Sequence, residues 1–244
     1  MLIREAVSHE DLDEITRIQR EVWNLEDIDI VGRIHLKASQ HAGGSVLIAL
    51  TDDGAIGGFS YAFPAFGGGR LFWHSDMLAV RPRFRSTGMG QRLKWAQREH
   101  ALGRGVDRIT WTFDPMQAAN AHLNLELLGA IATEYLIDFY GVTTSALHHG
   151  LPTDRLLACW DLKSPRVDAL SREERQSRPS SDTKVRIPVA WNELVRTAPD
   201  QARTEQQRIA RELRAGFSRG LVISGFDKPS SSYLLRPAPG SLSL

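Results

Sequence analysis

The sequence has little of several features that mark whole classes of protein. It contains one cysteine, Cys159, so a framework of intrachain disulfides is excluded. No run approaches eighteen apolar residues, which argues against a membrane-spanning helix. Its 30 Lys and Arg balance 29 Asp and Glu, for a net charge of +1. Such a balance creates no strong field to gather nucleic acid or an anionic membrane surface, so we expect neither as a partner.

Targeting and metal-binding patterns are also missing. Residues 1–5 show no basic segment leading into an apolar one, and we expect a cytoplasmic protein. His148 and His149 have no companion ligands at metal spacing, so the sequence predicts no metal site. Cys159 lies in an apolar run, which favours a buried structural thiol over a nucleophile.

The periodicity of apolar residues predicts a mixed α/β domain in residues 1–162. Ser8 is a good helix N-cap, and Leu12, Ile15, Ile18 and Val22 follow on one helical face. Further helices are predicted at 30–40, 91–102 and 118–128. Strands are predicted at 2–6, 45–50, 55–62, 71–80, 106–113, 135–140 and 156–162. The order is βααβββαβαββ, which is typical of a mixed sheet.

The remainder of the chain differs in composition. Residues 163–184 are polar and poor in apolar anchors, which predicts a linker. Residues 185–236 form a C-terminal α+β extension with strands at 185–190 and 221–226 and a helix at 199–219. These elements are too few to bury a core alone. We expect them to cover the substrate pocket, extend the sheet or exchange with a partner in a homodimer, and residues 237–244 to fray.

The most informative segment lies between the strand at 71–80 and the helix at 91–102. It reads Arg85, Ser86, Thr87, Gly88, Met89, Gly90. A glycine turn at a helix start directs backbone N–H groups and the positive end of the helix dipole to one point, which suits an anion. The loop lacks the Lys of a Walker A loop and the spacing of a dinucleotide fingerprint. An ordinary glycine turn is the alternative.

This Arg-x-x-Gly-x-Gly loop resembles the pyrophosphate loop of the GNAT superfamily of acyl-CoA-dependent N-acyltransferases. The element order of residues 1–162 is similar too. The resemblance implies a mixed, mostly antiparallel sheet flanked by helices, with acetyl-CoA or another acyl-CoA as co-substrate and no metal. It also implies cofactor contacts along the strand, the loop and the next helix, made by Met77, Leu78, Ala79, Val80, Arg85, Ser86, Thr87, Gly88, Met89, Gly90 and Asn120. Arg81 and Arg83 add positive charge.

The chemical step needs a base for the acceptor amine. In the GNAT fold this base often lies on the strand before the loop. His74 and Asp76 are two apart there and therefore on one face of a regular strand, and we take them as candidate catalytic residues. The tyrosine that often protonates the leaving thiolate in this family is replaced near Leu125. Water, Tyr135 or Tyr140 are the alternatives.

The sequence indicates less about the acceptor substrate than about the acyl carrier. The first two helices and residues 63–70 are expected to build its pocket, and Arg33 and Lys37, four apart on a helix, suit a carboxylate. Asp114-Pro115, the segment 120–124 and the segment 150–155 also resemble a narrower GNAT group, some of whose members are linked to N-succinylation of amino acids. The leading hypothesis is acyl transfer to a small amine or amino acid. A protein acyltransferase and a non-catalytic CoA-binding module are the alternatives.

Overall fold

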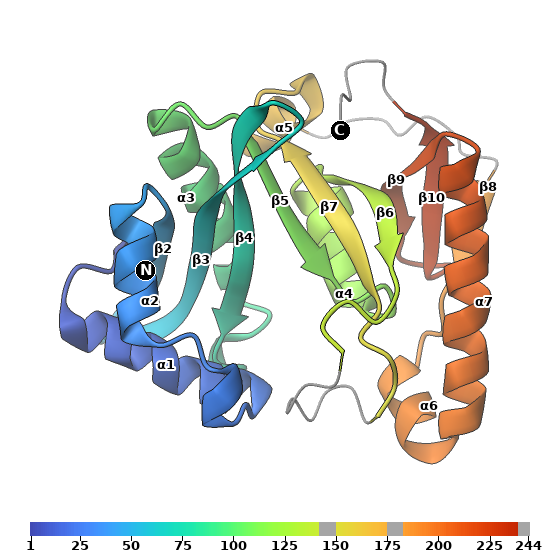
Figure 1. Ribbon diagram of the computed structural model, residues 1–244, viewed down its shortest axis with the longest axis horizontal. Helices are drawn as coiled ribbons and strands as arrows, with labels where there is room; N and C mark the ends of the chain where they lie inside the picture. Colours follow the sequence, from blue (N-terminus) through green and yellow to red (C-terminus); the bar gives the residue numbers. More distant parts are fainter. Residues whose placement is uncertain (142–149, 175–182, 239–244) are drawn as a thin grey trace. The chain divides into compact units, whose positions relative to one another are not determined.

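The computed structural model describes residues 1–141, 150–174 and 183–238, which form two compact units (Figure 1). The first unit runs from Met1 to Thr110, and the second contains the described residues from Trp111 onward. His148 and His149 and most of the polar segment 171–182 lie outside the described residues. The units are considered in turn.

The sheet of the first unit follows chain order. Strands β1 (Leu2–Glu5), β2 (Ser45–Leu50), β3 (Ile56–Gly67) and β4 (Arg70–Val80) are antiparallel neighbours. The start of β5 (Arg108–Phe113) then pairs parallel with β4. The mixed, mostly antiparallel sheet expected for the fold is therefore confirmed. Because β3 continues to Gly67, the expected loop at 63–70 is instead a hairpin whose turn is Gly68-Gly69.

Helices cover both faces of this sheet. The pair α1 (His9–Trp23) and α2 (Arg33–His41) buries one apolar cluster against β2, β3 and β4. Helix α3 (Met89–Gly103) buries a second cluster on the other face. The Ser8 cap of α1 is confirmed as a capping box, in which Ser8 and Asp11 bond each other's backbone N–H groups. Two short 3₁₀ turns, Asp27–Asp29 and Pro82–Phe84, complete the unit.

The second unit builds on a sheet whose strands follow the order β7, β6, β9, β10, β8. Their bounds are Arg155–Asp161, Ile131–Leu136, Leu221–Asp227, Ser232–Pro237 and Thr183–Arg186. Its helices are α4 (Ala118–Ala121), α5 (Pro165–Ser171), α6 (Trp191–Thr197) and α7 (Pro199–Ser218), with a π-helix at His122–Leu127. Helix α7 packs on β6, β8 and β9.

The C-terminal segment extends the sheet of this second unit. Ala132 of β6 pairs with Ile223 of β9, and β9 pairs with β10. Two buried hydrogen bonds tie the segment to earlier residues: the Glu126 carboxylate accepts from the Phe226 N–H at 2.5 Å, and the Tyr233 hydroxyl donates to the Pro115 carbonyl at 2.7 Å. Of the three arrangements considered for this segment, extension of the sheet is the one observed.

Several boundaries differ from the sequence prediction. The strand predicted at 135–140 is β6, which starts at Ile131 and stops before Asp138, a residue at φ 46. The helix predicted at 118–128 becomes a π-helix after Ala121, and the Leu128 N–H accordingly bonds the Leu123 carbonyl, five residues back. Helix α6 and strand β10 were not predicted.

The described residues at both ends of the predicted linker, and at the start of the predicted tail, belong to helices and strands. Within residues 163–184 the chain forms α5, which Ser164 caps and Pro165 opens, and β8 begins at Thr183. This cap-and-proline signal is local, so overall polarity concealed it. Pro237 belongs to β10 and the Ala238 N–H bonds Gly220, while 239–244 lie outside the described residues. The division of the chain into a domain at 1–162 and a C-terminal extension stays a prediction.

No helix within the described ranges is long and apolar enough to cross a membrane.

Candidate active site

The glycine loop leaves the first turn of α3 open. Gly88 is the N-cap of the helix and has φ 83, and Ser86 has φ 62, which is rare outside glycine. No side chain caps the helix, in contrast to α1 with its Ser8–Asp11 box. Residues 85–88 are exposed. The N–H groups of this turn therefore point to solvent with no intrahelical partner, which is the arrangement that binds an anion.

The end of β4 lies directly beside this loop. A Cβ on Gly90 would lie 3.7 Å from Val80 Cγ2 and 3.8 Å from Leu78 Cδ2. The parallel pairing of β4 with β5 is confined to Trp73 and His74, so residues 75–80 have no strand partner on that edge within the described chain. Leu78, Ala79 and Val80 thus combine buried or half-buried side chains with a backbone edge open to an extended ligand.

Strand β4 is irregular at the two residues between His74 and Met77. Its pairing with β3 slips there, since Phe63 faces His74 whereas Tyr61 faces Met77. Before the slip, Ser75 contacts α3; after it, Leu78 and Val80 pack on the α3 side. The alternation therefore shifts by one residue, as in a β-bulge. His74 and Asp76 nevertheless share one face of the sheet, as expected, and the bulge brings Met77 to that face as well.

The side chains of His74 and Asp76 both lie on the face of the sheet that packs against α2. The His74 ring lies 5.4 Å from the Phe63 ring, and His74 Nδ1 is 3.0 Å from Thr110 Oγ1. Asp76 makes no hydrogen bond or ion pair with another described residue. Burial raises the pKa of Asp76, and nearby His35 partly opposes this. Asp76 is thus a partly buried carboxylate with no protein partner in the described chain.

Tyr61 closes this cluster from β3. Its hydroxyl lies 2.7 Å from Ser39 Oγ of α2, and the His35 ring meets the Tyr61 ring edge-on at 6.2 Å. Burial, with a smaller effect of the Asp76 charge, raises the pKa of Tyr61 and keeps its hydroxyl neutral. The cluster combines one carboxylate with aromatic walls, an environment suited to an amine.

Sequence reasoning missed the polar group behind β4. Lys94 of α3 is 2% exposed, and its ammonium donates to Ser75 Oγ at 3.0 Å and to Gln97 Oε1 at 2.6 Å. The signal was present, because Lys94 and Gln97 fall between Leu93 and Ala101 on the apolar side of the helix. A polar residue at a core position is more informative than one on the surface.

The three arginines near the loop have different roles. Arg81 is largely buried and pairs with Glu14 and Glu21 of α1, so it holds the helix to the strand and is not a free phosphate ligand. Arg83 lies over the Phe84 ring, 4.5 Å from its centre, and is exposed. Arg85 is exposed, and its Nε is 3.5 Å from the Val80 carbonyl. Arg83 and Arg85 remain candidates for phosphate contact.

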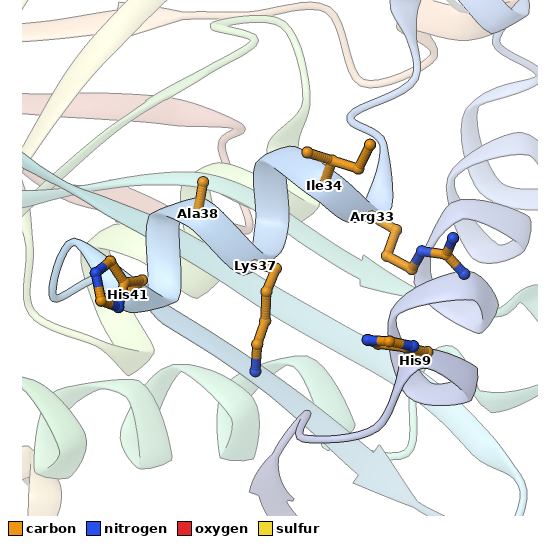
Figure 2. A pocket seen from close by; sticks show the side chains of 6 residues that line it. All are labelled: His9, Arg33, Ile34, Lys37, Ala38 and His41. Atoms are coloured by element: carbon orange, nitrogen blue, oxygen red, sulfur yellow. The ribbon is translucent and has the colours of Figure 1, made fainter.

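Arg33 and Lys37 do not belong to this cluster. They line an open hollow of about 530 Å³ with His9, Ile34, Ala38 and His41 (Figure 2). Arg33 already donates to Asp13 at 2.9 Å. The residues of α2 that face the sheet are Leu36 and Ser39, which lie on the other side of the helix. The predicted carboxylate clamp therefore receives no support.

The remaining sequence candidates lie in the second unit. Asn120 is exposed in α4, and Leu125 is fully buried in the π-helix. The Tyr135 hydroxyl donates to Asp154 Oδ2 at 2.7 Å, and burial together with this bond raises its pKa far above the usual value. Tyr135 is therefore a poor proton donor. The Tyr140 hydroxyl lies 2.9 Å from Thr112 Oγ1 and is more exposed.

Within the described ranges, no three His, Cys, Asp or Glu side chains gather in a way that would hold a metal ion.

Comparison with known proteins identifies the family of this domain. Residues 9–129 match the model of the acetyltransferase (GNAT) family. Comparison with curated proteins finds no match.

Solved structures agree on the fold. The Salmonella typhimurium protein YncA, solved with its cofactor acetyl-CoA, is 20% identical, with 74% of this chain and 98% of that chain covered and a TM-score of 0.53. A phosphinothricin acetyltransferase from Sinorhizobium meliloti, in complex with AcCoA, is 18% identical over 75% and 94% of the two chains, with a TM-score of 0.54. The ribosomal-protein-S18-alanine N-acetyltransferase of Escherichia coli is 15% identical over 67% and 94%, with a TM-score of 0.52.

Proposed function

Residues 9–129 place this chain in the GNAT acetyltransferase family, and from that premise we propose its reaction. The protein transfers an acyl group, acetyl or succinyl, from acyl-CoA to a primary amine of a small molecule or an amino acid. The amine attacks the thioester directly while both substrates are bound. The observation that carries the proposal is the uncapped start of α3 beside the unpaired edge of β4.

These residues fit the carrier that the family uses. A pyrophosphate needs several N–H donors and positive potential, and the turn from Arg85 to Gly90 supplies both. Backbone groups of Leu78, Ala79 and Val80 suit the amide-bearing pantetheine arm, because they lie on an edge that none of the described strands occupies. When bound, acyl-CoA supplies an activated thioester. Asn120 is proposed to contact the CoA arm, a role carried by the family resemblance alone.

Asp76 and His74 are proposed to prepare the amine. An ammonium group must lose a proton before it can attack, so a base with a pKa near neutral is most useful. Burial raises the pKa of Asp76 toward that range. His74 is held at Nδ1 by Thr110, and its other nitrogen has no hydrogen bond within the described chain. Either group accepts the proton directly or through a water, and backbone N–H groups stabilise the oxyanion.

The proton for the departing thiolate comes from water or from Tyr140 in this proposal. The Leu125 side chain has no acidic proton, and the Tyr135 hydroxyl is hydrogen-bonded to Asp154. A CoA thiol is also a fair leaving group, so a strong acid is not required.

The acceptor class is tested by a matched panel. Purified protein is incubated with acetyl-CoA or succinyl-CoA and with amino acids, simple amines or peptides of the same side chains, and free CoA is measured. Turnover with free amines supports the proposal, whereas turnover with peptides alone identifies a protein acyltransferase. Tight acyl-CoA binding without any turnover identifies a binding module. Neighbours named for phosphinothricin and for a ribosomal protein do not favour one class.

A further inference from the structure

Lys94 is a charged residue where a core residue is expected. Its side chain is almost fully buried between α3 and the sheet, and its ammonium group donates hydrogen bonds to Ser75 and Gln97. Ser75 and Gln97 are themselves 5% and 0% exposed. Removing an ammonium group from water is expensive, and an apolar side chain would fill the site at no such cost. A lysine buried at a core position therefore calls for an explanation beyond packing.

The position of the hydrogen bond between Lys94 and Ser75 supplies such an explanation. Ser75 stands between His74 and Asp76 in the chain, at the point where the pairing of β3 and β4 slips. Lys94 thus forms a hydrogen bond to β4 from the α3 side of the sheet, at the residue between the two candidate bases. On the other side, Thr110 fixes Nδ1 of the His74 ring at 3.0 Å. In the neutral tautomer whose Nδ1–H donates to Thr110, Nε2 presents a lone pair.

We propose that Lys94 is a positioning residue of the acyl-transfer site. Its ammonium group, hydrogen-bonded to Ser75, holds the bulge of β4 and keeps the His74 imidazole neutral, so that His74 can accept a proton. The catalytic consequence rests on the proposed function. The electrostatic effect on His74 does not, because it belongs to the protein alone.

The charge states are consistent with this role. Burial lowers the pKa of His74, and the Lys94 charge lowers it further. Burial also lowers the pKa of Lys94 to about 7. His74 titrates below its ordinary value of 6.5, where Lys94 is mostly protonated, so the repulsion operates in the relevant pH range.

Other groups surround the pair. The charged or titratable residues in and beside the elements that pack against β4 and α3 include Glu14, Glu21, His35, Tyr61, Arg70, Asp76, Arg81, Arg92, Arg98, Glu99, His100, Arg104 and Arg108. Among the described residues, Lys94 is the charge that shifts the pKa of His74. The effect should therefore follow the charge at position 94.

The test compares Lys94→Gln with Ser75→Ala. The first removes the charge and keeps a hydrogen-bond donor, and the second removes the hydrogen bond and keeps the charge. The pKa of His74 is measured by NMR titration of labelled histidine, with the resonance assigned by a His74→Gln variant. Lys94→Gln should raise the pKa of His74 and move the acidic limb of kcat/KM to higher pH. Ser75→Ala should leave the pKa of His74 low.

A second variant separates the loss of charge from a loss of stability. Lys94→Met replaces the buried charge by an apolar side chain of similar length, which often preserves or increases stability, and it should raise the pKa of His74 in the same way. An unchanged His74 pKa in the folded Lys94 variants overturns the proposal. If the shift occurs but no acceptor reacts, the proposed function fails and the electrostatic role stands.

Discussion

Gly88 offers the sharpest test of the loop, because the chain contains a matched control. Gly88 has φ +83, and a Cβ there would meet nothing within 4 Å. Gly54, in the turn between β2 and β3, has φ +84 and the same open surroundings. Alanine at either position is strained by its backbone alone. The left-handed conformation costs an L-residue about 1–2 kcal/mol.

The two substitutions should therefore destabilise the fold equally. For a chain of this size, each kcal/mol lowers the melting temperature by about 2–4 °C, so both variants should melt about 2–8 °C below the wild type. Their affinities for acyl-CoA should differ. At Gly88 the new methyl group stands at the open turn, where the pyrophosphate is proposed to meet the first N–H groups of α3.

Loss of one hydrogen bond to a charged group is worth about 1.5–3 kcal/mol, which corresponds to about a 10- to 100-fold weaker Kd. Isothermal titration calorimetry with acetyl-CoA and CoA measures it, and differential scanning calorimetry gives the stability. Gly88→Ala should bind acyl-CoA about 10- to 100-fold more weakly than the wild type, and Gly54→Ala should bind it with the wild-type affinity. Equal affinity in the two variants would refute the assignment of the loop, and an undiminished melting temperature in both would refute the strain argument.

Substitutions at Gly90, Asp76 and Asp11 test three other features of the structure. Gly90→Ala should keep both stability and acyl-CoA affinity, because its Cβ makes ordinary contacts at 3.7 and 3.8 Å; a loss of binding by calorimetry would contradict this. Asp76→Asn should lower kcat/KM by about 100-fold or more without changing the Kd of acyl-CoA. Because burial raises the pKa of Asp76, its ionisation opposes folding as pH rises, so the stability gained in Asp76→Asn should be larger at pH 8 than at pH 5 in urea denaturation; a gain independent of pH would exclude this cause. Asp11→Ala should cost about 1–3 kcal/mol at pH 7, since Asp11 caps α1 and pairs with Arg4 at 2.7 Å, whereas Asp13→Ala at an exposed pair should cost about 0–1 kcal/mol. The hydrogen bond to Arg4 lowers the pKa of Asp11, so this stabilisation should be present above pH 3.8 and disappear as pH falls through the lowered value, and equal losses in the two variants would contradict the assignment.

Local chemistry controls the features that could be predicted from the sequence. The cap at Ser8, the hairpin turn at Gly54 and the glycine loop before α3 each depend on a few adjacent residues and their backbone preferences. Apolar periodicity gave the element order of residues 1–162, because each element must bury one face. The resemblance to GNAT proteins rested on these same local features, and the family match over residues 9–129 confirmed it.

The site around the glycine loop depends on contacts between segments that are distant in the sequence. The slip between β3 and β4 shifts the alternation of side chains after Asp76, and no local sequence pattern predicts it because it arises from pairing between strands. The ion pairs of Arg81 with α1 join residues about sixty positions apart. The burial of Lys94 beneath Ser75 likewise depends on how α3 packs on β4. Periodicity can show which side of a helix is buried, but the partner that a buried charge meets is set by packing between distant segments.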